Sequence, residues 1–262
     1  MIDPTSDRPA YQQVADELRR RILSGQVEPG IKLPSETELI GEFEISRTTA
    51  RLAYGVLRTE GLIVTRRGFG AYVRDRRPVR RIAADRYRQA AIAARQGQQE
   101  TAFTRDQQIS WSDYRLDKEF SEVPAPAAVA ELLEVDPGTA LLARRFVFYS
   151  AGFPEQISLS YYPLSLVGGT PVADEANEPW PGGNIAQLAS LGISVTRVEE
   201  SVSARMPTPD ETRTLRIPPG VPVLTITRRM LAGPDRNQPV EAAVNITVPA
   251  DRAILDYALN ID

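Results

Sequence analysis

The sequence predicts an α+β fold in two domains, a helical domain at the N-terminus and a mostly antiparallel sheet domain at the C-terminus. Apolar residues recur at helical spacing in the N-terminal part. From Ile109 onward, strand-like runs outnumber helical ones, and turn signals separate them by short links. A chain of 262 residues with 42% hydrophobic residues suits about two domains. We expect these domains at residues 1–75 and 83–262, joined by a charged linker at residues 76–82.

Three helices are expected in order after a loose lead-in. The first covers residues 10–24, where apolar residues have helical spacing and Gly25 follows at a position typical of helix ends. Ser35 begins the second helix, because Glu38 three residues later gives the spacing of a capping box. A tight turn precedes Ser46, whose hydroxyl can cap the third helix. This order predicts a helix-turn-helix.

A hairpin and then a sheet are expected after these helices. Residues 62–65 and 71–74 are predicted to form short strands around a glycine-bearing tip. A helix is expected at residues 82–95, followed by a polar stretch with weak signals. The other expected strands are 109–116, 140–149, 155–162, 195–206, 223–232 and 240–248, and the other expected helices are 125–134, 185–191 and 208–215.

The composition excludes several kinds of active site. The chain has no cysteine and no histidine, which removes disulfides, thiolate or imidazole zinc sites, cysteine nucleophiles and histidine-based triads. Sites built only on carboxylates stay open, but no acid–base pair stands out, and we expect no cofactor, no metal and no enzymatic activity. Because no apolar run reaches about 18 residues and no signal core is present, we expect a cytoplasmic protein without a membrane segment.

Charge is unevenly distributed along the chain. Residues 1–81 contain 15 Lys and Arg against 11 Asp and Glu, whereas the remaining residues contain 16 against 23. The net charge of −3 hides this difference. A basic N-terminal part beside an acidic C-terminal part indicates a nucleic-acid partner at one end only.

The start of the third helix has side chains suited to a DNA duplex. Arg47 and Arg51 are four residues apart, so they share one helix face, and each guanidinium can fork onto guanine or grip a phosphate. Thr48 and Thr49 add hydroxyls for phosphate and methyl groups for thymine. In a helix-turn-helix this first turn enters the major groove. The pattern predicts double-stranded DNA as a partner.

The hairpin tip can extend the same surface. Arg66 and Arg67 can follow the DNA backbone or enter the minor groove, and Gly68 and Gly70 permit tight turning. Ser35, at the start of the second helix, completes the set of expected DNA contacts. A solvated arginine face or a glycine turn is common by itself. The prediction of DNA binding therefore rests on the order of the elements: two helices, a Ser-capped third helix and a basic hairpin.

A family resemblance covers about residues 9–74. It rests on Tyr11–Asp16, Gly25–Gly30, Leu33–Leu39, Ser46–Arg51 and Glu60–Leu62. In this order, these motifs resemble the winged helix of GntR-family bacterial repressors. The resemblance implies DNA contacts at the third-helix residues named above and at Gly68. Thr37 departs from the pattern, since many members have Arg there, so the operator preference is expected to differ.

A second resemblance covers about residues 81–258. It rests on Arg144-Arg145, Gly152–Pro154, Ser160–Pro163, Ala204–Pro209, Pro239–Glu241 and Pro249–Arg252. Their order and spacing are similar to the UTRA ligand-binding domain of the HutC-type branch of the same family. This resemblance implies a chorismate-lyase-like fold with a mostly antiparallel sheet, a homodimer and a small-molecule effector.

Polar residues on the expected strands are candidates for effector binding. Arg144 and Arg145 are adjacent, so only one can face a given pocket, and an arginine fork suits a carboxylate or a phosphate. An acidic effector is therefore one option. Phe146 and Phe148 stand where many family members have Arg, which disfavours a phosphosugar and leaves an apolar acid or a larger metabolite. The remaining candidates are Ser160, Tyr162, Arg205, Glu241 and Asn245.

Three functions fit these observations to different degrees. The leading interpretation is a ligand-responsive bacterial transcriptional repressor that binds a pseudo-palindromic operator as a homodimer. One alternative is a DNA-binding regulator whose second domain only dimerises or contacts a protein. The other is a lyase-like enzyme, which the absence of His and Cys argues against, because similarity of fold is not activity.

Overall fold

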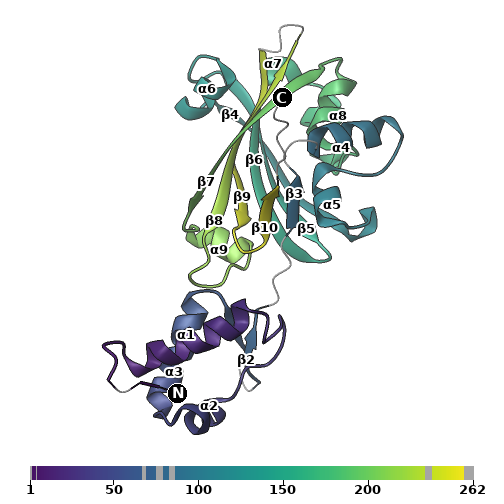
Figure 1. Cartoon of the computed structure of the whole chain (residues 1–262). Coiled ribbons are helices and arrows are strands. Elements are labelled where there is room, and N and C mark those ends of the chain that lie inside the picture. The colour runs from purple at the N-terminus through teal and green to yellow at the C-terminus, as the bar shows by residue number, and fades with distance from the viewer. Residues whose placement is uncertain are drawn as a thin grey trace, which may run out of the picture. The chain divides into compact units, whose positions relative to one another are not determined.

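The computed structural model describes residues 2–3, 5–66, 69–74, 79–82, 86–233 and 238–256 (Figure 1). The chain divides into two compact units, one built mainly from residues 1–77 and the other mainly from residues 78–262. The first unit is helical and the second is built around an antiparallel sheet, which confirms the predicted α+β class.

The first unit contains the three predicted helices and the hairpin. The amide of Glu38 donates to the Ser35 hydroxyl, and the Ser35 amide donates to the Glu38 carboxylate, so the predicted capping box is complete. The Ser46 hydroxyl accepts from the amide of Thr49 at 3.1 Å. The elements are α1 Ala10–Leu23, α2 Glu36–Phe43, α3 Arg47–Thr59, β1 Ile63–Arg66 and β2 Gly70–Val73.

One core holds the elements of the first unit together. Val14, Leu39, Ala50 and Leu57 have no exposed surface, and they come from all three helices. Full burial of one leucine side chain contributes about 1.5–3 kcal/mol. Because α3 places Ala50 and Leu57 in this core, its opposite face is fixed toward solvent.

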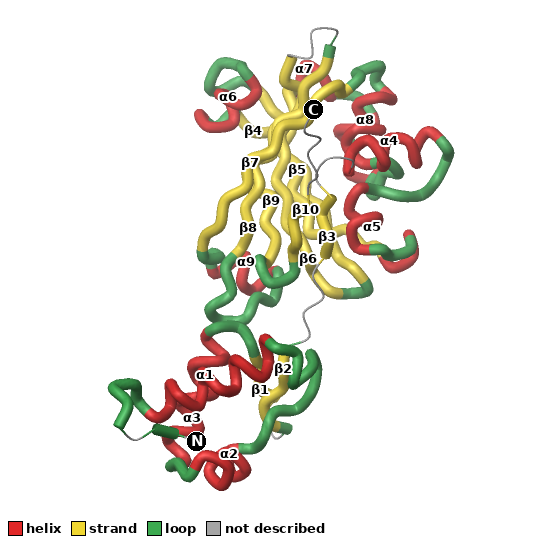
Figure 2. The backbone as a smooth tube through the Cα atoms, viewed as in Figure 1, coloured by secondary structure: helices red, strands yellow, loops and turns green. Residues whose placement is uncertain are grey.

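The second unit is built on a six-stranded antiparallel sheet with the order β4-β5-β6-β9-β8-β7 (Figure 2). Helices α4, α5 and α8 lie along one side of this sheet in Figures 1 and 2. The strands are β4 Tyr114–Pro124, β5 Ala140–Ser150, β6 Phe153–Pro163, β7 Val195–Arg205, β8 Val223–Ala232 and β9 Gln238–Pro249. The helices are α4 Arg86–Arg95, α5 Ala102–Gln107, α6 Ala127–Leu133, α7 Leu164–Val167, α8 Gly183–Ser190 and α9 Pro209–Thr214, with single 3₁₀ turns at Trp111–Asp113, Pro171–Ala173 and Glu175–Asn177.

Alternation along the strands divides the two faces of the sheet. Leu142 and Tyr162 point to the face where Leu188 of α8 packs. Ala143 and Tyr161 point to the other face, where α6 packs. A residue's position in this alternation therefore decides which face it can serve.

The structure differs from the sequence prediction in several segments, one of which is α5 at Ala102–Gln107, in the polar stretch where no element is predicted. β4 spans Tyr114–Pro124 instead of residues 109–116, because this strand alternates half-buried and exposed side chains and has a weak apolar signal. Val79–Ile82, expected at the end of the linker, forms β3, which pairs in parallel with β10 at Ala253–Asp256. Helix α4 consequently begins at Arg86, four residues later than predicted.

Candidate functional site

The first turn of α3 presents cationic and hydroxyl side chains to solvent. The side chains of Arg47 and Arg51 are each 66% exposed. Thr48 is exposed, and the hydroxyl of half-buried Thr49 lies 2.9 Å from that of Ser46. The N-terminal amides of a helix and its dipole also favour an anion at this end. The predicted residues of α3 therefore share one solvent-facing surface suited to phosphate.

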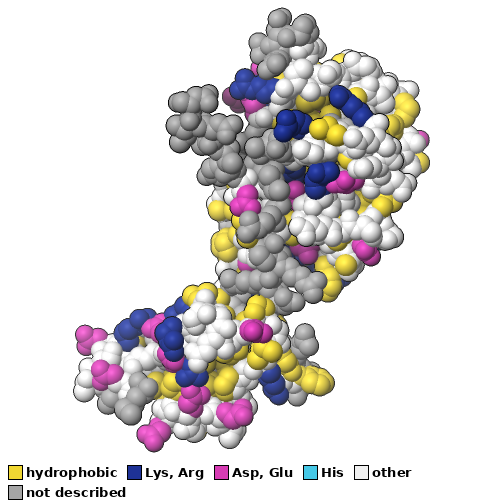
Figure 3. Space-filling view, turned by 45° about the vertical axis from the view of Figure 1, so that its right-hand side comes forward, with side chains coloured by type: hydrophobic (Ala, Val, Ile, Leu, Met, Phe, Trp, Pro, Cys, Tyr) yellow, Lys and Arg dark blue, Asp and Glu magenta, His cyan; other side chains and the backbone are white. Residues whose placement is uncertain are grey.

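Glu36, on α2, balances part of this positive surface. Its carboxylate oxygens lie 3.0 Å from Arg51 Nε and 3.9 Å from Arg47 Nε. Figure 3 shows basic and acidic side chains interspersed on the first unit. Ion pairs between exposed groups are weak, so a phosphate can replace the carboxylate without a large loss.

The hairpin is described only in part. Arg66 ends β1 and lies in register with Gly70, while the side chain of Arg66 and all of Arg67 and Gly68 lie outside the described residues. Phe69 is 67% exposed. Gly70 has a φ of 102°, a backbone conformation that favours glycine.

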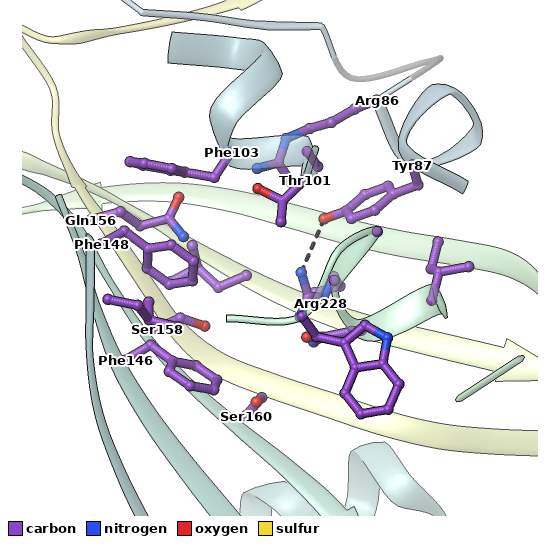
Figure 4. A pocket seen from close by; sticks show the side chains of 18 of the residues that line it. Arg86, Tyr87, Thr101, Phe103, Phe146, Phe148, Gln156, Ser158, Ser160 and Arg228 are labelled. Atoms are coloured by element: carbon purple, nitrogen blue, oxygen red, sulfur yellow. Dashed lines mark hydrogen bonds between the residues drawn. The ribbon is translucent and has the colours of Figure 1, made fainter. Parts of the chain in front are cut away.

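The second unit contains a cavity of about 80 Å³ on the side of the sheet where α4, α5 and α8 lie (Figure 4). Aromatic rings form much of its wall. The centroid of the Phe148 ring lies 5.1 Å from that of Phe103 on α5 and 5.8 Å from that of Phe146. Figure 4 shows the polar wall as a row of three β6 side chains, Gln156, Ser158 and Ser160.

Three arginines also line the cavity, and each is bound to a carboxylate. The pairs are Arg81 with Glu200 at 2.6 Å, Arg86 with Asp106 at 2.5 Å, and Arg228 with both oxygens of Glu241 at 3.1 and 2.5 Å. Burial alone would raise the pKa of Glu200, but the charges of Arg81, Arg86 and Arg228 and the hydrogen bond from Tyr87 together outweigh burial, so the pKa is lowered. These guanidinium groups are therefore paired ions held in the wall.

Tyr87, on α4, connects two of these pairs. Its hydroxyl donates to Glu200 and accepts from Arg228 Nη1 at 3.2 Å (Figure 4). Its ring also lies 5.7 Å from the guanidinium carbon of Arg228. This network ties α4 to strands β7 and β8.

Four of the predicted effector residues lie on the cavity side of the sheet, but only Ser160 lines the cavity. Arg144 is fully buried, donates to Glu178 and Gln187, and packs over three aromatic rings. Tyr162 is fully buried, as is Glu241, which holds Arg228. Arg144 and Glu241 therefore do not face the cavity but hold two residues that do, Glu178 and Arg228.

The other three predicted effector residues do not line the cavity. Arg145 follows Arg144 in the strand alternation, points to the opposite face and lies 3.6 Å from Asp210. Arg205 donates to both oxygens of Glu211 at 2.7 Å, which lowers the pKa of Glu211 to about 2. Asn245 is exposed. The structure does not bring these side chains together with Ser160.

Sequence reasoning missed the cationic wall. Arg81 falls in the predicted linker and Arg86 in the helix predicted at residues 82–95, and nothing local marks β3 as part of a sheet, since its partner strand is near the other end of the chain. Arg228 stands in a correctly predicted strand, but its contact with Glu241 follows only from the pairing of β8 with β9, in which Arg228 lies opposite Ala243 and Glu241 lies opposite Met230. One feature of the sequence did point to the cavity. Phe146 and Phe148 stand where many family members have Arg, and both rings line the cavity.

In the ranges that the structure describes, no group of three or more Asp or Glu side chains could hold a metal ion. No helix within those ranges is long and apolar enough to cross a membrane.

The sequence matches two protein families. Residues 10–73 match the gntR family of bacterial regulatory proteins, and residues 118–252 match the UTRA domain. An uncharacterized HTH-type transcriptional regulator of Streptomyces coelicolor is 33% identical over 84% of this chain and 82% of its own. The histidine utilization repressor of Pseudomonas putida is 30% identical over 90% of this chain and 86% of its own.

Solved structures agree with these matches. A crystal structure of a GntR-family transcriptional regulator has a TM-score of 0.63 and 32% identity, and covers 98% of this chain and 99% of its own. The crystal structure of PhnF from Mycobacterium smegmatis, with a TM-score of 0.52 and 20% identity, covers 95% of this chain and 100% of its own and shares the fold.

Proposed function

Since the chain belongs to the gntR family of bacterial regulatory proteins and contains a UTRA domain, we propose that it is a cytoplasmic transcriptional repressor. It binds a pseudo-palindromic operator as a homodimer, and a small molecule in the second unit changes its affinity for that operator. Two relatives, the histidine utilization repressor of Pseudomonas putida and the transcriptional repressor NagR of Bacillus subtilis, are repressors, which supports repression over activation. We assign residues 1–75 to DNA binding, 76–82 to a linker and 83–262 to effector binding and dimerisation.

The exposed first turn of α3 is the observation that carries the DNA-binding part of this proposal. Arg47 and Arg51 project from a helix whose other face is locked in the core, and the N-terminal end of that helix favours phosphate. We assign Ser35, Thr48 and Thr49 to the same surface, together with Arg66, Arg67 and Gly68 of the hairpin. Thr37 is exposed on α2 and gives this surface a shorter side chain than the arginine of many members.

Fluorescence anisotropy with a duplex selected from a random pool tests this part. Arg47→Ala with Arg51→Ala is expected to weaken specific binding at least about 30-fold, because each of the two bidentate base contacts is worth about 1–3 kcal/mol. Arg58→Ala is the matched control, since it removes the same charge from the exposed C-terminal end of α3 and is expected to change affinity less than threefold. Unchanged binding by the double variant would disprove the assignment.

The cavity beside Ser160 supports an effector-binding unit over one that only dimerises. Its wall combines aromatic rings with a few placed polar groups, the usual character of a small-molecule site. Native mass spectrometry of protein purified from its host cells is expected to show a retained metabolite. The metabolite should then change operator affinity at least fivefold, and a retained molecule without such an effect would contradict effector control.

The homodimer has its own test. Light scattering after size-exclusion chromatography is expected to give twice the 28.9 kDa of one chain. The selected duplex should contain two related half-sites in inverted order, because a two-fold dimer reads a palindrome. A monomer in solution bound to a single half-site would disprove this arrangement.

A further inference from the structure

We propose that the effector is an uncharged aromatic compound, one ring in size, that carries a hydrogen-bonding group. This inference rests on the proposed function, because it names the class of molecule that the same cavity binds. It follows from four features of the wall: its rings, its charge balance, its polar atoms without partners, and its size.

The apolar part of the wall favours a flat ligand. The rings of Phe103, Tyr114, Phe146 and Phe148 form one cluster, with centroid separations between 5.1 and 6.3 Å for the contacts with Phe148. Met230 and Ile246 of the sheet add to the apolar surface. Offset stacked and edge-to-face contacts with such rings stabilise an aromatic ligand by about 0.5–1.5 kcal/mol per ring pair beyond area burial.

The arginines do not provide a free cation for an acid. The cavity-lining cations Arg81, Arg86 and Arg228 are 9% exposed or less at the side chain, and each is bound to a carboxylate of its own. Glu178, the acidic residue of the wall, is bound in turn to Arg144. These four ion pairs balance one another, so an anionic ligand would add an unbalanced charge to a buried site, which is strongly unfavourable.

Two polar atoms in the wall remain available for a neutral ligand. Among the residues that the structure describes, Ser160 Oγ and Arg81 Nε have no hydrogen-bond partner although both are buried. A buried hydroxyl can donate or accept, and the guanidinium Nε can donate without breaking the bond from Nη2 to Glu200. An amide or hydroxyl group on the ligand can bond to either atom without bringing a charge.

The volume favours a small ligand of about one ring. The cavity of about 80 Å³ is smaller than the ~150 Å³ cavity that holds a benzene molecule in an engineered protein core. Binding therefore requires small side-chain adjustments even for one ring. A multi-ring compound would require larger side-chain adjustments, and a sugar phosphate would also bring an unbalanced negative charge.

A matched pair of probes tests the charge rule. We would titrate the full-length chain with 4-fluorobenzamide and 4-fluorobenzoate and measure both dissociation constants by ¹⁹F NMR. The two probes have nearly the same shape and differ in charge. The amide is expected to bind at least ten times more tightly than the acid. Equal or tighter binding of the acid, or no binding of the amide, would overturn the inference.

Two variants locate the site and its charge dependence. Ser160→Ala is expected to weaken amide binding about fivefold, while Ser121→Ala, an exposed serine on β4, should leave it unchanged. Losing a hydroxyl that has no partner is not expected to destabilise the fold. Glu200→Gln removes the counter-charge of Arg81 and is expected to tighten benzoate binding at least tenfold. Should this variant fail to fold, the wild-type comparison decides by itself.

The proposed ligand class and the proposed function can fail independently of each other. Effector control depends on whether the metabolite retained from host cells shifts operator affinity, whatever its charge. An acidic metabolite that shifts operator affinity would overturn the ligand class and leave the regulator intact. A neutral aromatic metabolite that binds without shifting operator affinity would support the ligand class and contradict effector control.

Discussion

The buried pair between Arg228 on β8 and Glu241 on β9 gives a direct test of the charge-balanced wall. Their side chains are 9% and 0% exposed, and two hydrogen bonds of 3.1 and 2.5 Å join them. Glu241→Gln keeps an acceptor oxygen but leaves the guanidinium without a counter-charge. Removing one partner of a buried pair costs about 3–5 kcal/mol. We expect the lower end, about 3 kcal/mol of unfolding free energy, because Tyr87 still accepts from Arg228 at 3.2 Å.

Replacing both partners separates the charge effect from packing. Arg228→Met with Glu241→Leu removes both charges at similar volume and is expected to lie within about 1 kcal/mol of wild type, since an apolar replacement of a buried pair is often neutral. Trp111 and Trp180 are the two tryptophans and both belong to the second unit. Urea unfolding followed by tryptophan fluorescence therefore reports that unit. A single variant that loses less than about 1 kcal/mol, or a double variant less stable than the single one, would refute this reasoning.

Three further predictions concern the two units separately. Ser46→Ala removes the α3 cap and is expected to cost about 1 kcal/mol of stability in the first unit, measured by thermal unfolding. Glu36→Gln frees Arg47 and Arg51 and is expected to raise affinity for random-sequence DNA severalfold at low salt, with the gain disappearing at high salt. The folded-state pKa of Glu211, about 2, lies below its usual 4.5, so its stabilising effect is complete above pH 4.5 and is lost as the pH falls toward 2. Urea midpoints for Glu211→Gln should show a weaker pH dependence across that range, and parallel curves would contradict this.

The first unit was predictable because its signals are local. Ser35 and Ser46 each cap a helix through an amide three residues away, so spacing in the sequence is enough to place both helix starts. The exposed face of α3 follows from the same helix, since the positions of Ala50 and Leu57 fix the buried side. The contacts of this face with DNA remain a prediction.

The cavity was less predictable because it depends on register and on distant segments. Ser160 was chosen for its strand face and does line the cavity, whereas Arg144 and Arg145 could not be assigned without knowing which face the helices cover. Arg81 reaches the wall only because β3 pairs with β10, at the far end of the chain. No pattern within either segment indicates that pairing.

The central claim is that one chain couples a small molecule in the second unit to DNA held by the first. The most direct measurement is the dissociation constant of the selected duplex, by anisotropy, without and with a saturating amount of the metabolite retained from host cells. Two coupled sites typically influence each other by about 5–150-fold, and the effect must be reciprocal. The account predicts a shift of at least fivefold, with the duplex changing metabolite affinity by the same factor. An operator affinity that stays the same when the cavity is fully occupied would contradict it.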